Sequence, residues 1–433
     1  MRRAALLGLV AMLAVACTRG RIVHGDRVDE DGLAAVERSI VAIRGRPLLE
    51  RVPAVVLDPA GLRDMIARDI DASFAPGDIE RVETVYAQVG LLPPNASLRA
   101  SIERLYEAEG AAFYDPRGKR LIISTKPFAT PFALRMVGFL AGRDLAGEMV
   151  VAHELVHAIQ DQHWGVPTDP DPIADAQGDC RLAHRALLEG DATLAGFGQI
   201  LGGGPDAKAV GAIERELAKL PAELATRYPD VPPALLATLT VQYHAGAVFV
   251  GRALRDGGWR AVDALHEDPP TSTEQILHPE RYFDTRDAPV AIALGGTETL
   301  AGWTPVVQDS FGELFVRVIA ERTLPRERAA AVAAGWGGDR LRALARGDEM
   351  VLVWMTTWDT PADADEWDEA VRGLLPRAHV ARRDLHVLAI IAPPAVDAPA
   401  TAAAVMDRTR FTRGLTCRAA VPPDARSAAR SRT

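Results

Sequence analysis

The sequence predicts a predominantly helical α+β protein, and three observations support this fold class. A run without proline, with apolar residues at helical spacing, extends from about Asp144 to Trp164. A second helical pattern covers residues 176–201. Short apolar runs at residues 350–355 and 385–391 are typical of strands. The order of these patterns indicates a large, mostly helical domain followed by a small α+β module.

Length and charge exclude some classes of protein. The chain has 433 residues, which is enough for two domains and a large core. Its 49 Lys and Arg face 58 Asp and Glu, so the formal net charge is −9 and no basic block compensates. We therefore expect no nucleic-acid partner, because binding to phosphates needs a cationic surface. The composition leaves the oligomeric state open.

Residues 1–17 have the pattern of an export signal. Arg2 and Arg3 precede an apolar stretch that is too short for a comfortable transmembrane helix. The end of this stretch resembles a bacterial lipobox, although alanine stands where leucine is preferred: Leu13-Ala14-Val15-Ala16-Cys17. The resemblance implies a lipid anchor at Cys17, and ordinary signal cleavage is the alternative.

The residues after Cys17 bear on location. Thr18 is not the aspartate that commonly retains such lipoproteins at the inner membrane, so the resemblance favours the outer membrane of a bacterial envelope. Residues 18–32 are predicted to form a polar tether. The remaining cysteines, Cys180 and Cys417, are free to pair outside the cytoplasm, but two cysteines do not make a disulfide framework.

The first part of the large domain is mostly helical in pattern. Helical spacing runs from Ala34 to about Tyr106 and is broken by several prolines. Residues 111–124 contain two apolar runs around Asp115-Pro116-Arg117-Gly118, which predicts a β-hairpin. An edge strand of this hairpin could pair with an extended peptide, or the hairpin could be a simple surface feature.

The helix from about Asp144 to Trp164 carries the motif H-E-x-x-H. His153 and His157 are four residues apart, so they differ by only about 40° of rotation and leave the same face of a helix. That face can supply two nitrogens to one tetrahedral zinc ion. Glu154 lies beside them, where a carboxylate can act as a general base toward water. The alternative is a core helix with two satisfied histidines.

A zinc site needs a third protein ligand, and two candidates exist. Glu189 lies in a helical pattern 32 residues beyond His157, next to Gly190, which would let two helices approach closely. Asp191 or Asp179 could then accept a hydrogen bond from a ligand imidazole. His163 has the spacing of the third ligand in metzincins, but that family has a glycine where Gln160 stands. If the helix continues, His163 points elsewhere.

Later segments supply the other candidates. Helices are predicted over about 212–224 and 233–254, and Tyr243 and His244 in the second are expected to be core residues. A capped turn follows Pro269-Pro270, and His278 or Tyr282 near its end could stabilise an oxyanion. The alternative is a structural turn with an incidental histidine.

The module is predicted from local patterns. A helix near 311–321 is followed by a glycine-rich joint at 334–340, which lacks the pattern of a phosphate-binding loop. We set the limits of the large domain at 33–325 and of the module at 326–417. Residues 418–433 are expected to be a disordered tail.

The motifs together resemble a family of exported gluzincin-like proteins of bacteria and haloarchaea. The resemblance is carried by the segment from His153 to His163, by Leu188-Glu189-Gly190-Asp191-Ala192 and by residues 272–279. It implies a zincin-like fold and Zn²⁺ bound by His153, His157 and Glu189. The expected activity is a zinc metallopeptidase acting on a peptide or protein substrate, with Glu154 and His278 as catalytic residues. The alternative is a non-catalytic envelope lipoprotein with a structural or scavenging zinc site.

Overall fold

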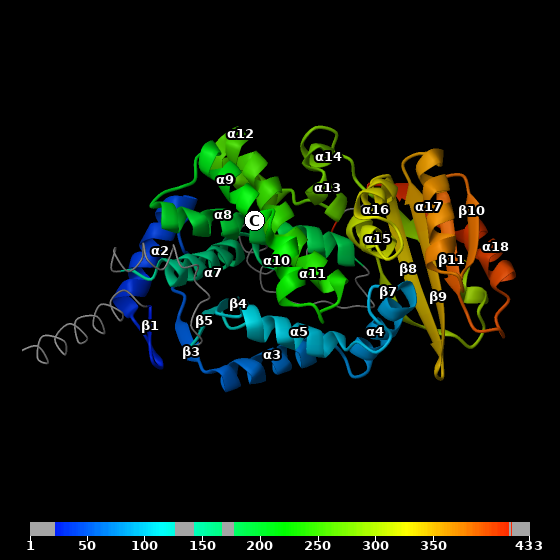
Figure 1. The fold of residues 1–433 in the computed structure, drawn as a ribbon, viewed down its shortest axis with the longest axis horizontal. Coiled ribbons are helices and arrows are strands. Elements are labelled where there is room, and N and C mark those ends of the chain that lie inside the picture. The colour runs from blue at the N-terminus through cyan, green and yellow to red at the C-terminus, as the bar shows by residue number, and fades with distance from the viewer. Residues whose placement is uncertain (1–21, 126–142, 167–176, 415–416, 418–433) are drawn as a thin grey trace, which may run out of the picture.

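The structure, a computed structural model, describes residues 22–125, 143–166, 177–414 and 417. Figure 1 shows a mostly helical body that is followed by a module built around a larger sheet. The predicted α+β class is thereby confirmed. The export signal and the predicted tail, residues 418–433, lie outside the described residues, so the lipid anchor at Cys17 and the disordered tail stay predictions.

The segment predicted as a tether is ordered where the structure describes it. Strands β1 (Val23–His24) and β2 (Arg27–Val28) form a short hairpin, and helix α2 (Glu30–Arg44) begins directly after it. Asp29 caps α2 by accepting a hydrogen bond from the backbone N–H of Gly32. The apolar face of α2 is buried against α7 and α8. The tether prediction is therefore wrong for residues 22–32.

A three-stranded sheet follows, with β4 at one edge. Its order is β3, β5, β4, in which β3 is parallel and β4 antiparallel to β5. The predicted hairpin at 111–124 is confirmed as β4 and β5, whereas β3 was missed within the helical pattern. The elements are β3 (Ala54–Leu57), α3 (Pro59–Ser73), α4 (Asp78–Val89), α5 (Leu98–Glu109), β4 (Ala112–Asp115) and β5 (Arg120–Ser124).

Long helices form the centre of the body. Helix α7 packs against α8, and α8 packs against the stretch that contains α12. The predicted helix over 212–224 is two helices, because the chain breaks at Ala218 and Lys219. These elements are α7 (Leu145–Trp164), α8 (Gly178–Leu201), α9 (Ala207–Leu217) and α10 (Leu220–Arg227).

The next helical stretch contains one wide turn. Helix α11 (Pro233–Thr240) continues through a π-helical segment, Val241–Ala245, into α12 (Gly246–Glu267). By length and composition the stretch Pro233–Glu267 meets the criterion for a membrane span, a test that buried helices also pass. In the structure it lies along α8. Two short helices, α13 (Thr273–Leu277) and α14 (Pro279–Phe283), lead to the module.

The module is an antiparallel sheet with helices on both faces, ordered β10, β11, β9, β8, β7. The glycine-rich segment predicted as a joint is mostly the start of β8, where a bulge follows Trp336. The strands of this sheet are β7 (Thr304–Asp309), β8 (Trp336–Arg346), β9 (Glu349–Trp358), β10 (His379–Arg383) and β11 (His386–Ile391). A separate antiparallel pair is formed by β6 (Val290–Ala293) and β12 (Arg410–Arg413). The helices are α15 (Gly312–Ala320), α16 (Arg326–Ala333), α17 (Pro361–Leu374) and α18 (Ala398–Arg408).

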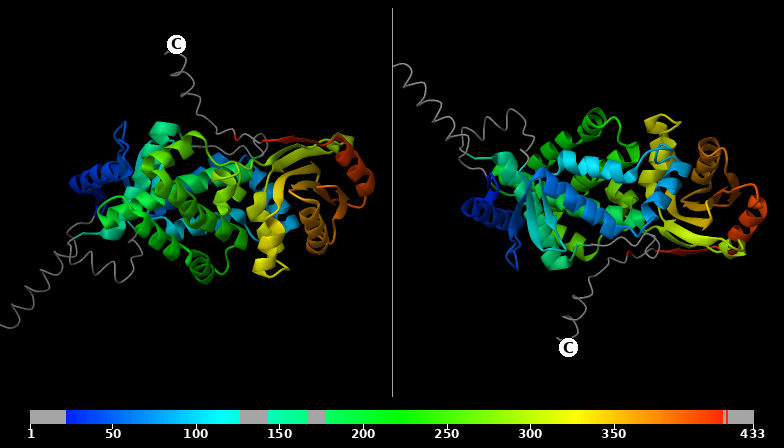
Figure 2. Two further views of the ribbon diagram at one scale, coloured as in Figure 1. Left: turned by 90° about the horizontal axis from the view of Figure 1, so that it is seen from above. Right: turned by 90° about the horizontal axis from the view of Figure 1, so that it is seen from below.

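The module begins earlier than predicted and shares its core with the N-terminal helices. Strand β7 belongs to the same sheet as β8, so a boundary at residue 325 would cut the sheet. One face of the sheet is buried against α15, α16 and α17, and apolar residues of α3 and α4 join the same core. Helix α18 covers the other face. Figure 2 shows α3 and α4 running from the body to the module.

Cys180 and Cys417 form a disulfide, with their Cα atoms 6.2 Å apart. The pair is 237 residues apart in sequence. It links the start of α8 to the chain beyond β12, as the cysteine count allowed.

Candidate metal centre

Helix α7 places its histidines at the edge of the core. Asp144 caps the helix by accepting from the N–H of Gly147, at 3.1 Å. One face of α7 is fully buried and carries Val151, Ala152, Leu155, Val156, Ala158 and Ile159. His153, Glu154 and His157 are only partly buried. The helix thus holds these three side chains rigidly while leaving them accessible from one side.

Glycines let α8 approach its neighbours. A β-carbon on Gly196 would lie 3.2 Å from the backbone oxygen of Met149 and 3.4 Å from Cβ of His153, so α8 runs close to α7 there. A β-carbon on Gly190 would collide with the backbone of Gly246 at the start of α12. The predicted close approach at Gly190 is confirmed, and its partner is the α12 stretch.

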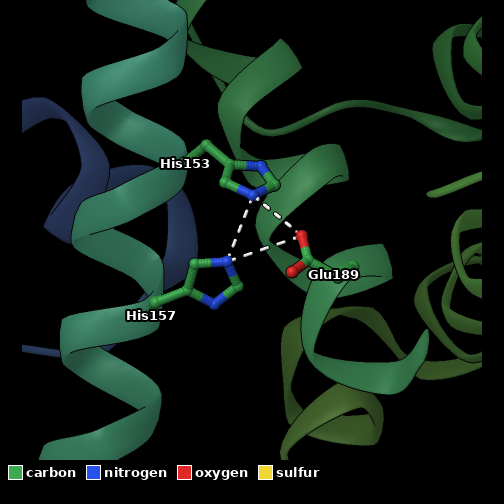
Figure 3. A group of neighbouring side chains, drawn as sticks. All are labelled: His153, His157 and Glu189. Carbon is green, nitrogen blue, oxygen red and sulfur yellow. Dashed lines mark hydrogen bonds and ion pairs between the residues drawn. The ribbon is translucent and has the colours of Figure 1, made fainter. Parts of the chain in front are cut away.

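His153, His157 and Glu189 come together between α7 and α8 (Figure 3). Nε2 of His153 lies 3.1 Å from Oε2 of Glu189 and 3.1 Å from Nε2 of His157. Nε2 of His157 lies 3.5 Å from the same carboxylate oxygen. A tetrahedral zinc ion with bonds of about 2.0–2.1 Å holds its ligand atoms about 3.3 Å apart. The three atoms therefore have the spacing and the chemistry of a zinc ligand set.

The same three groups are strongly coupled electrostatically. Burial lowers the pKa of His157, but the Glu189 carboxylate outweighs it and raises the pKa to about 9. Burial raises the pKa of Glu189, and the two imidazoles outweigh this and hold it far below its usual range. Without a metal the group thus retains a proton between Glu189 and a histidine, and a bound cation would replace that proton.

Glu154 lies beside this group and is oriented by the hairpin. Its Oε2 accepts a hydrogen bond of 2.8 Å from the backbone N–H of Tyr114, on the outer edge of β4. Burial raises the pKa of Glu154, although the charges of His153 and His157 oppose the shift. A carboxylate with a raised pKa beside a ligand set is suited to a general base.

The hairpin is itself fixed to α7. Asp161 accepts a hydrogen bond from the hydroxyl of Tyr114 at 2.6 Å and one from Nζ of Lys119 at 2.6 Å. Two residues of the hairpin are thus anchored one turn beyond His157. The edge of β4 faces α7, and its N–H at Tyr114 is already used by Glu154.

His163, the alternative third ligand, does not join the group. Helix α7 continues to Trp164, and Nε2 of His163 lies 2.9 Å from the backbone oxygen of Pro47. His163 therefore points away from the two histidines, as helical rotation predicts, and the structure brings Glu189 to them instead.

His278 and Tyr282 have other partners. Nε2 of His278 lies 2.9 Å from Oε1 of Glu313 on α15, and the hydroxyl of Tyr282 donates to the backbone oxygen of Asp268 at 2.6 Å. Neither residue is brought to the three ligands. The interactions of His278 fit the structural turn that was the alternative interpretation.

Tyr243 is a site residue that the sequence analysis assigned to the core. It lies in the π-helical segment, and its ring centre is 6.1 Å from that of His153. The charge of Glu189 and burial together raise the pKa of its hydroxyl well above the usual value. Single π-turns often occur at functional sites. The contact between Gly190 and Gly246 brings this turn to Glu189, and a pairing of two distant glycines is not readable from local spacing.

One further group of acidic residues has metal-like spacing. Carboxylate oxygens of Glu274, Asp287 and Asp359 lie within 4.8 Å of one another. Nη1 of Arg281 lies 2.8 Å from Glu274, 2.9 Å from Asp287 and 2.8 Å from Asp359. A guanidinium therefore already supplies the cation at this group.

Comparison with known proteins gives a match for the module alone. Residues 299–411, less than half of the chain, match a family described as "Domain of unknown function (DUF8575)". The matched segment contains β7 to β11 and the first half of β12, which agrees with a module that begins before residue 326. It includes none of the three ligand residues. No curated protein matches the chain. No solved structure matches it either.

Proposed function

We propose that this protein is a zinc-dependent peptidase whose helical body is zincin-like. The observation that carries the proposal is the meeting of His153, His157 and Glu189 within ligand distance of one another, with Glu154 beside them. Their side chains remain 15–20% exposed, so a substrate can approach the group from the open side. A purely structural zinc site usually has four protein ligands and needs no base.

The residues of the chain have distinct tasks in this proposal. His153, His157 and Glu189 hold Zn²⁺, which when bound acidifies water and polarises a carbonyl. Glu154 takes the proton of the attacking water and passes it to the leaving amine. Tyr243, whose ring lies beside that of His153, is better placed than His278, which pairs with Glu313, to donate to a developing oxyanion.

The substitution Glu154→Gln tests the proposal. It keeps the shape of the side chain and removes the basic carboxylate, so we expect unchanged zinc content and a loss of turnover of about 10²–10⁴-fold. Zinc content is measured by elemental analysis, and turnover by mass spectrometry of a digested peptide library. Glu148→Gln is the matched control on the same helix, because Glu148 pairs with Arg143 rather than with the ligand group.

Two outcomes would contradict the proposal. Full cleavage by zinc-loaded Glu154→Gln would exclude Glu154 as the base. A zinc-loaded wild-type protein that cleaves no peptide would favour the second candidate function, a non-catalytic zinc-binding protein.

A further inference from the structure

Gln160 connects a ligand histidine to the interior of the protein. It lies on α7 three residues after His157 and is only 1% exposed. Its Nε2 donates to the backbone oxygen of Leu188 at 3.0 Å and to Oδ2 of Asp191 at 3.1 Å. Its Oε1 lies 2.8 Å from Nδ1 of His157. All three contacts are made by one buried amide.

These contacts fix which nitrogen of His157 carries a proton. A backbone carbonyl and a carboxylate can only accept, so the amide NH₂ must face Leu188 and Asp191. The amide oxygen therefore faces His157 and requires a donor there. Nδ1 of His157 must carry the proton, and in the neutral ring Nε2 then offers its lone pair toward His153 and Glu189.

Asp191 is in turn held by a buried cation from α2. Arg44 donates to Asp191 through Nε at 2.7 Å and through Nη2 at 3.1 Å, and both side chains are 0% exposed. Nε2 of His266 lies 2.8 Å from the same carboxylate. The Arg44 guanidinium also pairs with Asp263 at 2.8 Å and lies over the ring of Trp259. A directed chain of contacts thus leads from Arg44 through Asp191 and Gln160 to His157.

We infer that Gln160 is a positioning residue that fixes the tautomer and orientation of His157 for metal binding, and that the pair of Asp191 and Arg44 acts on the metal through it. This inference rests on the proposed metal site and extends it to α2, the helix that supplies Arg44. Asp191 orients the amide of Gln160 and strengthens its oxygen as an acceptor, because a hydrogen bond to an ionised group polarises its donor.

The first test measures the affinity for Zn²⁺ of the full-length protein by competition with a chromogenic chelator. Gln160→Met keeps the length of the side chain and removes the amide, so we expect zinc binding to weaken by about 10–100-fold. Gln162→Met is the matched control, because Gln162 lies two residues further on α7 and, within the described part of the chain, bonds the backbone at Leu49 and Glu50 and not the ligand group. The control should bind zinc as the wild type does.

A double-mutant cycle separates positioning from a merely structural role. Asp191→Asn alone should weaken zinc binding, and its effect should largely disappear when Gln160 is already methionine. Equal effects of Asp191→Asn in both backgrounds would contradict action through Gln160. Circular dichroism and a melting curve are recorded for each variant, and Gln160→Leu replaces Gln160→Met throughout the cycle if the methionine variant fails to fold.

A spectroscopic readout needs no activity. In the Co²⁺-loaded protein, the Nδ1–H of each ligand histidine should give a shifted, exchangeable proton signal. The signal of His157 should exchange with solvent faster in Gln160→Met than in the wild type. An unchanged zinc affinity and an unchanged signal would overturn the inference, whereas a wild type that binds no metal would overturn the proposed function itself.

Discussion

Two aspartates on helix α8 are equally deep in the protein and are held in opposite ways. Asp191 lies in the middle of the helix, near the candidate metal ligands, where it faces Arg44 and His266. Asp179 lies near the module end, where its Oδ1 accepts from the N–H of Thr273 at 3.1 Å and from its hydroxyl at 2.5 Å. The residue type and the burial are the same, so the partners alone decide the charge.

The pKa values follow these partners. Burial raises the pKa of Asp191, but Arg44 and His266 outweigh it and hold the pKa far below the usual range. Burial raises the pKa of Asp179 to about 8, and the carboxylates of Asp339 and Glu313 add to the shift. Asp191 is therefore ionised beside the candidate cation site. Asp179, where α8 meets the module, is largely protonated at neutral pH.

The largest effect is expected at the candidate metal ligand on α8. Glu189→Ala should lose most of the zinc, which the motif predicts at about one ion per chain, because two imidazoles alone are a weak site. Asp179→Asn is the control on the same helix and should keep its zinc. His163→Ala should also keep it, because His163 contacts Pro47. Elemental analysis after gel filtration gives the stoichiometry, and the reverse pattern would assign the third ligand to His163.

The next effect concerns the cation that keeps Asp191 charged. Arg44→Met leaves Asp191 and Asp263 buried without their guanidinium, so the free energy of unfolding should fall by about 3–5 kcal/mol. The control is Arg46→Met, because Arg46 also pairs with Asp263 but is 35% exposed. That control should lower the free energy of unfolding by about 1 kcal/mol or less. Urea denaturation measures both, and equal losses would mean that burial of the Arg44 pair is unimportant.

The two aspartates also show what the sequence could predict. The spacing of His153 and His157 on one helix face is local, so their shared face followed from helical periodicity. Glu189 was selected because it lies in a helical pattern beside a glycine. The sequence offered both Asp191 and Asp179 as acceptors for a ligand imidazole, and nothing local distinguishes them. In the structure Gln160 contacts the imidazole of His157, and Asp191 accepts a hydrogen bond from the amide of Gln160.

The other features that were not predicted correctly have the same physical origin. Tyr243 reaches Glu189 only because Gly190 and Gly246 allow two helices to touch, which depends on tertiary packing. His278 was chosen from a local motif, and its contact with Glu313 depends on where α15 lies. The module boundary was placed too late because α15 and α16 separate β7 from its partner strand β8 in the sequence. Each of these depends on contacts between segments distant in sequence, which periodicity does not encode.

The most gradual expected effect is on stability as a function of pH, and it sharpens the contrast between the two aspartates. The folded pKa of Asp179 is raised to about 8, above the ordinary value of 3.8. Its contribution to stability is therefore fully present below about pH 4 and is lost as the pH rises through about 8. The loss from one such group is at most about 1.4 kcal/mol per pH unit. In Asp179→Asn this dependence should vanish, so the variant should gain stability relative to the wild type between pH 5 and pH 8.

For Asp191 the sign is reversed. Its folded pKa is depressed by Arg44 and His266, so its contribution is present above the unfolded value and is lost as the pH falls. Asp191→Asn should therefore be less stable than the wild type at pH 7, and the difference should shrink toward pH 3. Melting temperatures of both variants and the wild type, recorded at pH 3, 5, 7 and 8.5 without zinc, test both signs in one series. Parallel curves for Asp179→Asn and the wild type would show that Asp179 is ionised in the folded protein, and the contrast between the two aspartates would fail.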